Sequence, residues 1–593
     1  MKASLQHTLS FSLSILVTIT STHASPPDPR EIGRQLDEII YGPESLSQAQ
    51  VVDDATYLRR ISLDLVGRPP SAGEITAFGL NPAEDKRSAH VSELLDRSEY
   101  AVNWTRYWRD TIFSRATNIR AALVRPAFEE WMEESLKDNH SWKQVATDLL
   151  TATGDVNENG ATALIFAHEG EPEEIASEAS RIFLGIQIQC ANCHDHPWDR
   201  WKREQFHEFA AFFPRVALRR DPEGGMFDFQ IVSMNQDRSR RAGVSRFVLS
   251  RIDRNRDDII SEAESKGTLL ERLFSGQAKD LIDKNGDGRL SIEEITTAQP
   301  PDNNRPGQGS TEHYMADLSD PSSRGTLIHP AFFADEEPVR RNLSDLDRRE
   351  AVSELVTSSE WFAKSTVNRI WSELTSTAFY QPIDDIGPDR KCEHEAALEL
   401  LSTGFRDSGY DLKWLMTAIT STRLYQRPID SQAEGFLRLE PRRLRSDQLY
   451  DALCQTLNVT ALPLRFTGRR VPSARTRDLG REQFADTFGF DPSVPRDDLT
   501  GSIPEALFMM NSPELASFVR SSGQNSLISR ISRQVLSDED VIRELYLVTV
   551  GREPQGTELQ ICMQHLAESP SRSEGLEDIL WSLLNGTEYQ SRS

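Results

Sequence analysis

The stretch ATYLRRISLDLVG, residues 55–67, sets the expected fold class. Its aliphatic residues recur at helical spacing, and Gly67, followed by two prolines at 69 and 70, marks the end of the helix. Ser71 and Glu74 then supply the Ser-x-x-Glu pattern of a capping box, which begins a second helix. The stretch therefore predicts two helices joined by a tight turn.

Helical patterns of this kind recur along the 593 residues, at 203–213, 351–356, 362–374, 395–405 and 411–419. Alternating patterns typical of strands are few, at QIQC (187–190) and MFDFQIV (226–232). At roughly 150 residues per domain, the length indicates about four domains. We expect a mainly α, multidomain helical protein with few short strands.

The composition indicates packed cores under a solvated surface, with 38% hydrophobic and 27% charged residues. The formal net charge of −25 argues against nucleic acid as a partner, because a duplex binder needs a basic surface. An excess of carboxylates instead suits a protein that meets divalent cations.

Residues 1–24 have the pattern of a signal peptide. Lys2 precedes an apolar stretch diluted by Ser and Thr (9–20), and Thr22-His23-Ala24 offers small residues for cleavage. We expect an exported protein, periplasmic or extracellular. No later run reaches 18 apolar residues, so we expect no transmembrane segment in the mature chain.

Two segments near the opposite ends of the chain resemble each other. LVGRPPSAGEI (65–75) is matched by TVGREPQGTEL (549–559), and LLDRSEY (94–100) is matched in the same order by LLNGTEY (583–589). The order favours a diverged duplication of a helix-turn-helix unit. Convergence of unrelated helix ends on similar turn residues is the alternative.

The strongest motif is DKNGDGRLSIEE, residues 283–294, which fits a calcium-binding EF-hand loop. Asp283, Asn285 and Asp287 offer side-chain oxygens at loop positions 1, 3 and 5. Arg289 offers its carbonyl at position 7, and Glu294 closes the shell at position 12. Gly288 stands at position 6, where the chain must turn sharply. The motif predicts Ca²⁺ as a ligand.

A second copy, DRNRDDIISEAE, lies 30 residues upstream at 253–264. Its oxygens come from Asp253, Asn255 and Asp257, the carbonyl of Ile259, and Glu264. Asp258 stands where glycine is usual, so this residue must adopt a left-handed conformation at some cost. We expect an EF-hand pair at 238–298, in which the first loop binds calcium more weakly or mainly packs against the second.

The stretch CANCHDHPWDRW (190–201) contains the C-x-x-C-H pattern of covalent c-type haem attachment. In this interpretation Cys190 and Cys193 anchor the haem and His194 ligates the iron, with Met226, Met234 or His207 as the sixth ligand. A second interpretation is a different metal bound by these residues with His196. A third is a short disulfide that stabilises a tight turn. The sequence leaves all three open.

Several segments also resemble a known family, the planctomycete cytochrome-c-like proteins built from domains of unknown function 1549 and 1553. Residues 59–70, 177–201 and 209–216 resemble the first domain. Residues 367–371, 408–427 and 441–453 resemble the second domain. The resemblance implies a first helical domain at 30–216 carrying C-x-x-C-H, and a second at 331–593. The EF-hand pair is then an insertion, followed by a linker at 299–330, which is rich in Pro, Gly, Ser and Asn. No reaction follows from the resemblance.

These patterns give two functional hypotheses. The first is a redox or electron-transfer component with covalent haem c and a redox partner protein. The second is a non-redox, calcium-dependent scaffold or binding protein. Whether the chain is an enzyme stays open. We also expect Trp104, Tyr107 and Trp108 to be core residues, the arginines at 442, 443 and 445 to form surface ion pairs, and His394 to lie at a helix start.

Overall fold

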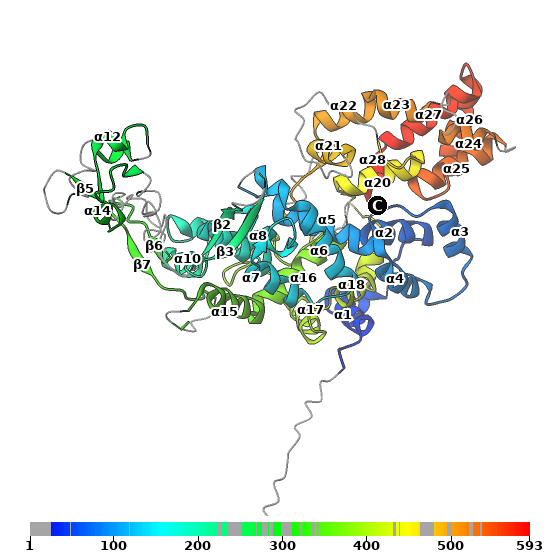
Figure 1. Cartoon of the computed structure of the whole chain (residues 1–593). Helices are drawn as coiled ribbons and strands as arrows, with labels where there is room; N and C mark the ends of the chain where they lie inside the picture. The colour runs from blue at the N-terminus through cyan, green and yellow to red at the C-terminus, as the bar shows by residue number, and fades with distance from the viewer. Residues whose placement is uncertain are drawn as a thin grey trace, which may run out of the picture.

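The structure is a computed structural model (Figure 1). It describes residues 25–592 apart from 48, 118, 222–224, 226–227, 235–248, 250–251, 269, 275–282, 284–288, 298–310, 321–322, 335–338, 341–342, 431–434, 438, 440, 463–478, 495–500, 521–525 and 534–536. The signal peptide predicted at 1–24 lies outside the described residues. Among the described residues, no helix is long and apolar enough to cross a membrane.

The chain is mainly helical, as the sequence predicts. The N-terminal region consists of α1 (Pro29–Leu46), α2 (Asp54–Val66), α3 (Ala72–Leu80), α4 (Lys86–Asp96), α5 (Ser98–Phe113), η1 (Ile119–Leu123), α6 (Arg125–Lys137), α7 (Trp142–Thr151), η2 (Gly160–Thr162), α8 (Ala163–Ala167), α9 (Pro172–Ala179), the π-helical turn η3 (Ser180–Leu184), η4 (Ile188–Asn192) and α10 (Arg203–Ala210).

Helices also form the second half of the chain. They are α15 (Asp345–Ser358), α16 (Glu360–Thr375), α17 (Glu395–Asp407), α18 (Leu412–Thr420), α19 (Arg423–Gln426), η7 (Gly435–Leu437), α20 (Ser446–Leu457), α21 (Leu479–Phe488), α22 (Ile503–Asn511), α23 (Pro513–Val519), α24 (Leu527–Ser532), α25 (Asp538–Val550), α26 (Gly556–Glu568), α27 (Arg572–Asn585) and α28 (Thr587–Gln590).

The strands are short and pair antiparallel in small sheets. β1 (Gly154–Asp155), β3 (Phe229–Ser233) and β2 (Val216–Arg220) form one sheet in that order. The other pairs are β4 (Ile259–Ile260) with β5 (Leu290–Ser291), β6 (His313–Met315) with β7 (Thr326–Ile328), and β8 (Arg442–Arg443) with β9 (Ser591–Arg592).

Two of these elements correct the sequence-based expectation. The strand predicted at QIQC is wrong, because residues 188–192 form the 3₁₀ turn η4. Ile188 is buried between polar neighbours, so its short apolar pattern fits a buried turn as well as a strand. The segment 299–330, expected to be a linker, contains the β6–β7 hairpin, and His313 in β6 is buried.

One hydrophobic core joins the two halves of the chain. It contains side chains from α1, α2, α5 and α7 and also from α16, α17 and α18. Trp104, Tyr107 and Trp108 of α5 are buried in it, as predicted, and Trp108 stacks on Trp142 at a ring separation of 4.0 Å. A second core forms among α20–α28.

The resembling segments adopt the same turn. α2 ends at Gly67 (φ 74°) and α25 at Gly551 (φ 77°), where the left-handed backbone favours glycine. In the first copy Arg68 Nη1 lies 3.0 Å from Glu74 Oε2, and in the second Arg552 Nη1 lies 2.8 Å from Glu558 Oε2. Each glutamate also closes a capping box. This shared geometry supports a duplication.

The two copies contact each other. Arg59 on α2 is buried, and its guanidinium donates to the carbonyl oxygens of Thr549 (3.3 Å) and Glu588 (3.1 Å). The C-terminal helices therefore dock onto the N-terminal unit. In Figure 1 these helices lie at the upper right, and α12 (Glu262–Ser265), β5 and α14 (Ile292–Thr297) lie at the far left of the molecule.

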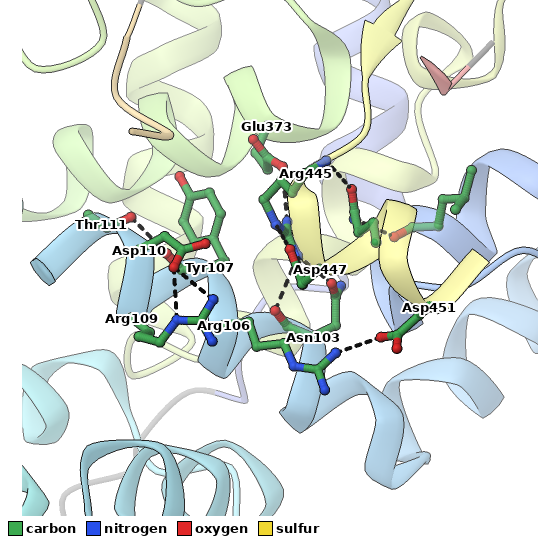
Figure 2. A network of polar contacts seen from close by, with 12 residues as sticks. Asn103, Arg106, Tyr107, Arg109, Asp110, Thr111, Glu373, Arg445, Asp447 and Asp451 are labelled. Atoms are coloured by element: carbon green, nitrogen blue, oxygen red, sulfur yellow. Dashed lines mark hydrogen bonds and ion pairs between the residues drawn. The ribbon is translucent and has the colours of Figure 1, made fainter. Parts of the chain in front are cut away.

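The arginines at 442 and 445 are buried, so the predicted surface ion pairing is wrong for them. Arg445 contacts Glu373 (Nη1–Oε1, 3.2 Å) and Asp447 (Nε–Oδ1, 3.2 Å), and it donates to Asn103 on α5 (Figure 2). Arg442 Nη2 lies 2.8 Å from the same Glu373 oxygen. The sequence could not show that these arginines are buried, because Glu373 and Asn103 come from distant segments.

Candidate functional site

The loop at 253–264 is held by its own carboxylates. Asp253 is buried, and its oxygens accept the backbone amides of Arg256 (2.7 Å) and Asp258 (2.9 Å). Asp257 Oδ1 accepts the amide of Ile259 at 3.0 Å. Glu264 closes the loop, since its Oε1 accepts the amide of Arg254 at 2.9 Å. The oxygens at positions 1, 5 and 12 thus face the loop backbone.

Asp258 has the conformation expected from its position. Its φ is 60°, in the left-handed region that glycine usually supplies at position 6 of such a loop. An aspartate tolerates this conformation better than most residues but at a cost. The sharp turn is therefore present without glycine.

The loops at 253–264 and 283–294 pair with each other. Ile260 lies opposite Leu290 and Ile259 opposite Ser291 in the β4–β5 pair. Ile260 and Leu290 belong to a separate small core, whose other buried members are Leu249, Leu270, Ile292 and Ile295. The pairing is centred on position 8, which lies opposite position 8 of the other loop, and position 7 of the first loop lies opposite position 9 of the second.

Both loops close in the same way. The Ser261 hydroxyl donates to Glu264 Oε2 at 2.6 Å, and the Ser291 hydroxyl donates to Glu294 Oε2 at 2.7 Å. Both glutamates are buried. The hydroxyl and amide of Ser261 lower the pKa of Glu264 to about 2, so this carboxylate is ionised.

The second loop is described only in part. Asp283 is half-buried and Arg289 is exposed. Asn285 and Asp287 lie outside the described residues. The roles of all these residues as calcium ligands stay predictions.

The C-x-x-C-H residues lie at the surface of the first half. Cys190 and Cys193 are exposed, free thiols, so the structure has no disulfide between them. His194 is exposed, and its Nδ1 lies 2.7 Å from the carbonyl oxygen of Asp195. Trp198 is 73% exposed, whereas Trp201 is buried against Phe333. The segment is therefore anchored to the core by Trp201, whereas its two cysteines and His194 are exposed to solvent.

The described candidates for a sixth haem ligand are engaged elsewhere. His207 is buried, with both ring nitrogens in hydrogen bonds. Met234 is buried, and its sulfur accepts from Arg219 at 3.4 Å. Met226 lies outside the described residues.

A different set of ligand-type side chains comes together close by. Within the described part of the chain, Glu173, His207 and His313 are the one group of three or more His, Cys, Asp or Glu side chains whose ligand atoms lie within 4.8 Å of one another. Sequence reasoning missed His313, because it lies in the segment interpreted as a linker. Its one local signal is the short pattern HYM, which forms β6.

Two family models match this chain. One, described as a protein of unknown function (DUF1549), matches residues 40–217, and the other, a protein of unknown function (DUF1553), matches residues 348–478. The chain carries both domains of unknown function. The DUF1549 region contains the C-x-x-C-H segment, and both loops lie between the two matched regions. No curated protein and no solved structure matches the chain.

Proposed function

We propose that this chain is an exported, calcium-binding multidomain protein whose paired loops at 253–264 and 283–294 hold Ca²⁺. The first loop would bind through Asp253, Asn255, Asp257, Glu264 and the carbonyl of Ile259. These are the oxygen donors that calcium prefers. The second loop would bind through Asp283, Asn285, Asp287, Glu294 and the carbonyl of Arg289.

The observation that carries the proposal is the matched closure of the two loops. Two separate stretches bury a glutamate at the same loop position, bond it to a serine three residues earlier, and join through strands centred on position 8 of each loop. Each glutamate accepts from this serine's hydroxyl and backbone amide. A bound cation would give both buried carboxylates a further favourable partner of opposite charge.

Calcium would act here as a structural element. Among the described residues, the core beneath the loops contains six buried side chains, and a core this small gains from an additional stabilising ligand. Binding would add free energy to the folded state alone. Outside the cytoplasm calcium is often near millimolar, so even a site with Kd of roughly 10⁻⁴ M would stay filled. The proposal of export thus favours a constitutive role, in a module that docks or orders a partner.

Calorimetric melting of the mature chain tests this proposal. We expect calcium to raise the temperature of a transition and a chelator to lower it. Glu264→Gln and Glu294→Gln should each reduce the calcium response, since each removes a buried ligand charge. Glu262→Gln is the matched control, because Glu262 is exposed on the same short helix α12. A melting profile that a chelator leaves unchanged would contradict a structural role for calcium.

A second candidate function is redox chemistry at a covalent haem. The observation that favours it is that Cys190 and Cys193 are both free and exposed, and hence open to attachment. His194 would be the iron ligand, and a redox partner protein is then required. The other-metal and structural interpretations remain its competitors.

A haem stain on a denaturing gel distinguishes these alternatives. Protein made together with the haem-attachment machinery should keep its stain after denaturation, and Cys193→Ser should lose it. The calcium response should be unchanged in that variant. Absence of covalent haem in the parent protein would leave calcium binding as the function.

A further inference from the structure

His207 and His313 form a buried pair on two distant elements. His207 is on α10 and His313 on β6, and each is only 3% exposed. His207 Nδ1 lies 2.9 Å from His313 Nε2. Glu173, in the first turn of α9, approaches from the other side, with its Oε1 3.9 Å from His313 Nδ1. The Glu173 side chain is 33% exposed, so the group is open to solvent at this one residue.

The hydrogen bond of His207 to the backbone fixes its tautomer. Its Nε2 lies 3.1 Å from the carbonyl oxygen of Asn192, which can only accept, so Nε2 carries the proton. In the neutral ring Nδ1 then accepts the Nε2–H of His313, so a metal bound between the two rings requires His313 to carry its proton on Nδ1 instead. The hydrogen bond of His207 Nε2 to Asn192 is the arrangement of a metal-ligating histidine, which donates its other ring N–H to a carbonyl.

The surroundings keep both rings in the form that binds metals. Burial, together with the nearby His313 and Arg203, lowers the pKa of His207 to about 4. Burial likewise lowers the pKa of His313 to about 4. Both imidazoles are therefore neutral at neutral pH. Burial also raises the pKa of Glu173, and a bound cation would shift this pKa in the opposite direction.

We propose that Glu173, His207 and His313 form a binding site for a divalent transition metal of the zinc type, with positions left for water or a substrate. The donor set of two imidazoles and one carboxylate suits such an ion and not Ca²⁺, which takes oxygen ligands. The site is separate from the calcium proposal and uses none of its residues.

The required adjustment is small. Zinc bonds of about 2.0–2.1 Å in a tetrahedral arrangement place two nitrogens about 3.3 Å apart, so the two rings must separate slightly from 2.9 Å. Glu173 must move toward the rings, which its half-buried side chain can do. The Asn192 carbonyl lies between Cys190 and Cys193 in sequence, so the metal would also steady the base of the C-x-x-C-H segment.

Zinc titration of the metal-free mature chain, with calcium in excess, tests the site. We expect one zinc ion per chain. His207→Gln keeps an N–H for the Asn192 carbonyl but removes the Nδ1 ligand, and His313→Asn removes Nε2, so each should weaken zinc binding at least 100-fold. Glu173→Gln should weaken it about 10- to 100-fold. His565→Gln, on the exposed face of α26, is the matched control and should bind like the parent.

Cobalt substitution separates this site from the neighbouring cysteines. The Co²⁺ form should show no thiolate charge-transfer band, and the double variant Cys190→Ser, Cys193→Ser should bind zinc as the parent does. The proposal is overturned if folded His207→Gln and Glu173→Gln proteins bind zinc with parental affinity. It is also overturned if the cysteine variant abolishes binding, or if the parent binds no zinc.

Discussion

At the scale of single residues, stability depends on buried charges that are paired across the sequence. Asp384 is 1% exposed and lies between two buried arginines, Arg181 (Nη1–Oδ2, 2.8 Å) and Arg369. Burial opposes the charged carboxylate, but the two guanidinium groups outweigh it and hold the pKa of Asp384 below its usual range. Removing one member leaves the others as uncompensated buried charges.

Asp384→Asn should therefore lower the free energy of unfolding by about 3–5 kcal/mol. Asp385→Asn is the control next in sequence, because Asp385 pairs with Arg390 at a half-exposed site. Its loss should be about 0–1 kcal/mol. Urea denaturation of both variants checks the difference, and equal losses would refute the importance of the buried cluster.

His168 is also buried, but its polar atoms are unpaired, unlike those of Asp384. It is fully buried, and both of its ring nitrogens lack a hydrogen-bond partner in the structure. Burial lowers its pKa to about 4; Glu178 opposes this shift and Arg181 adds to it. The folded-state pKa is thus below the unfolded value near 6.5. The unfolded chain binds the proton first, so stability is complete above pH 6.5 and falls as the pH drops toward 4.

His168→Phe should stabilise the protein at neutral pH by about 1 kcal/mol, because it removes unpaired buried polar groups. Below pH 6.5 the parent protein should lose up to about 1.4 kcal/mol of stability per pH unit through protonation of His168, and the variant should be free of this loss. Melting temperatures of parent and variant between pH 7.5 and 5 check this. A difference in melting temperature that does not increase toward acid pH would contradict the lowered pKa of His168.

At the scale of elements, the repeated helix-turn-helix unit depends on its central glycine. Gly67 has φ 74°, and a Cβ there would lie 2.6 Å from Asn103 Oδ1. Asn103 in turn donates to the carbonyl of Asp64 at the end of α2. Both backbone strain and this contact oppose a side chain at residue 67.

Gly67→Ala should cost about 1–3 kcal/mol of stability. Gly79→Ala is the control in the next helix, α3, where a Cβ would meet nothing within 4 Å. That change should stabilise the protein by about 0.5–1 kcal/mol. Thermal melts of the two variants should therefore shift in opposite directions, and a neutral Gly67→Ala would contradict the turn.

Local features of these elements could be predicted from the sequence, whereas their long-range contacts could not. The helix at 55–66, its glycine end and the capping box of Ser71 with Glu74 are local patterns, and the structure confirms them. The conformation of residues 188–192 depends on packing that the local sequence does not encode. The apolar residues of this turn are buried against α9 and α10 rather than within a sheet. The arginines at 442 and 445 and the pairing of His207 with His313 depend on long-range contacts that no spacing encodes.

At the scale of the whole molecule, two regions of different character are joined. The DUF1549 and DUF1553 regions contribute to one large core and are tied by buried ion pairs. The loops at 253–264 and 283–294 have a separate core, in which six buried side chains are described. Under the calcium proposal, removal of Ca²⁺ should therefore unfold the region of these two loops first and leave the large core intact. The sequence predicts that the two loops form a pair, but the core beneath them includes Leu249 and Leu270 outside the loops, and these became evident from the structure.

The measurement that tests the calcium proposal most directly is isothermal titration of the metal-free mature chain with Ca²⁺. We expect two bound ions, or one where Asp258 weakens the first loop, with the heat abolished in the double variant Glu264→Gln, Glu294→Gln and retained in Glu262→Gln. No calcium binding by the parent at millimolar concentration, or undiminished binding by the double variant, would contradict it.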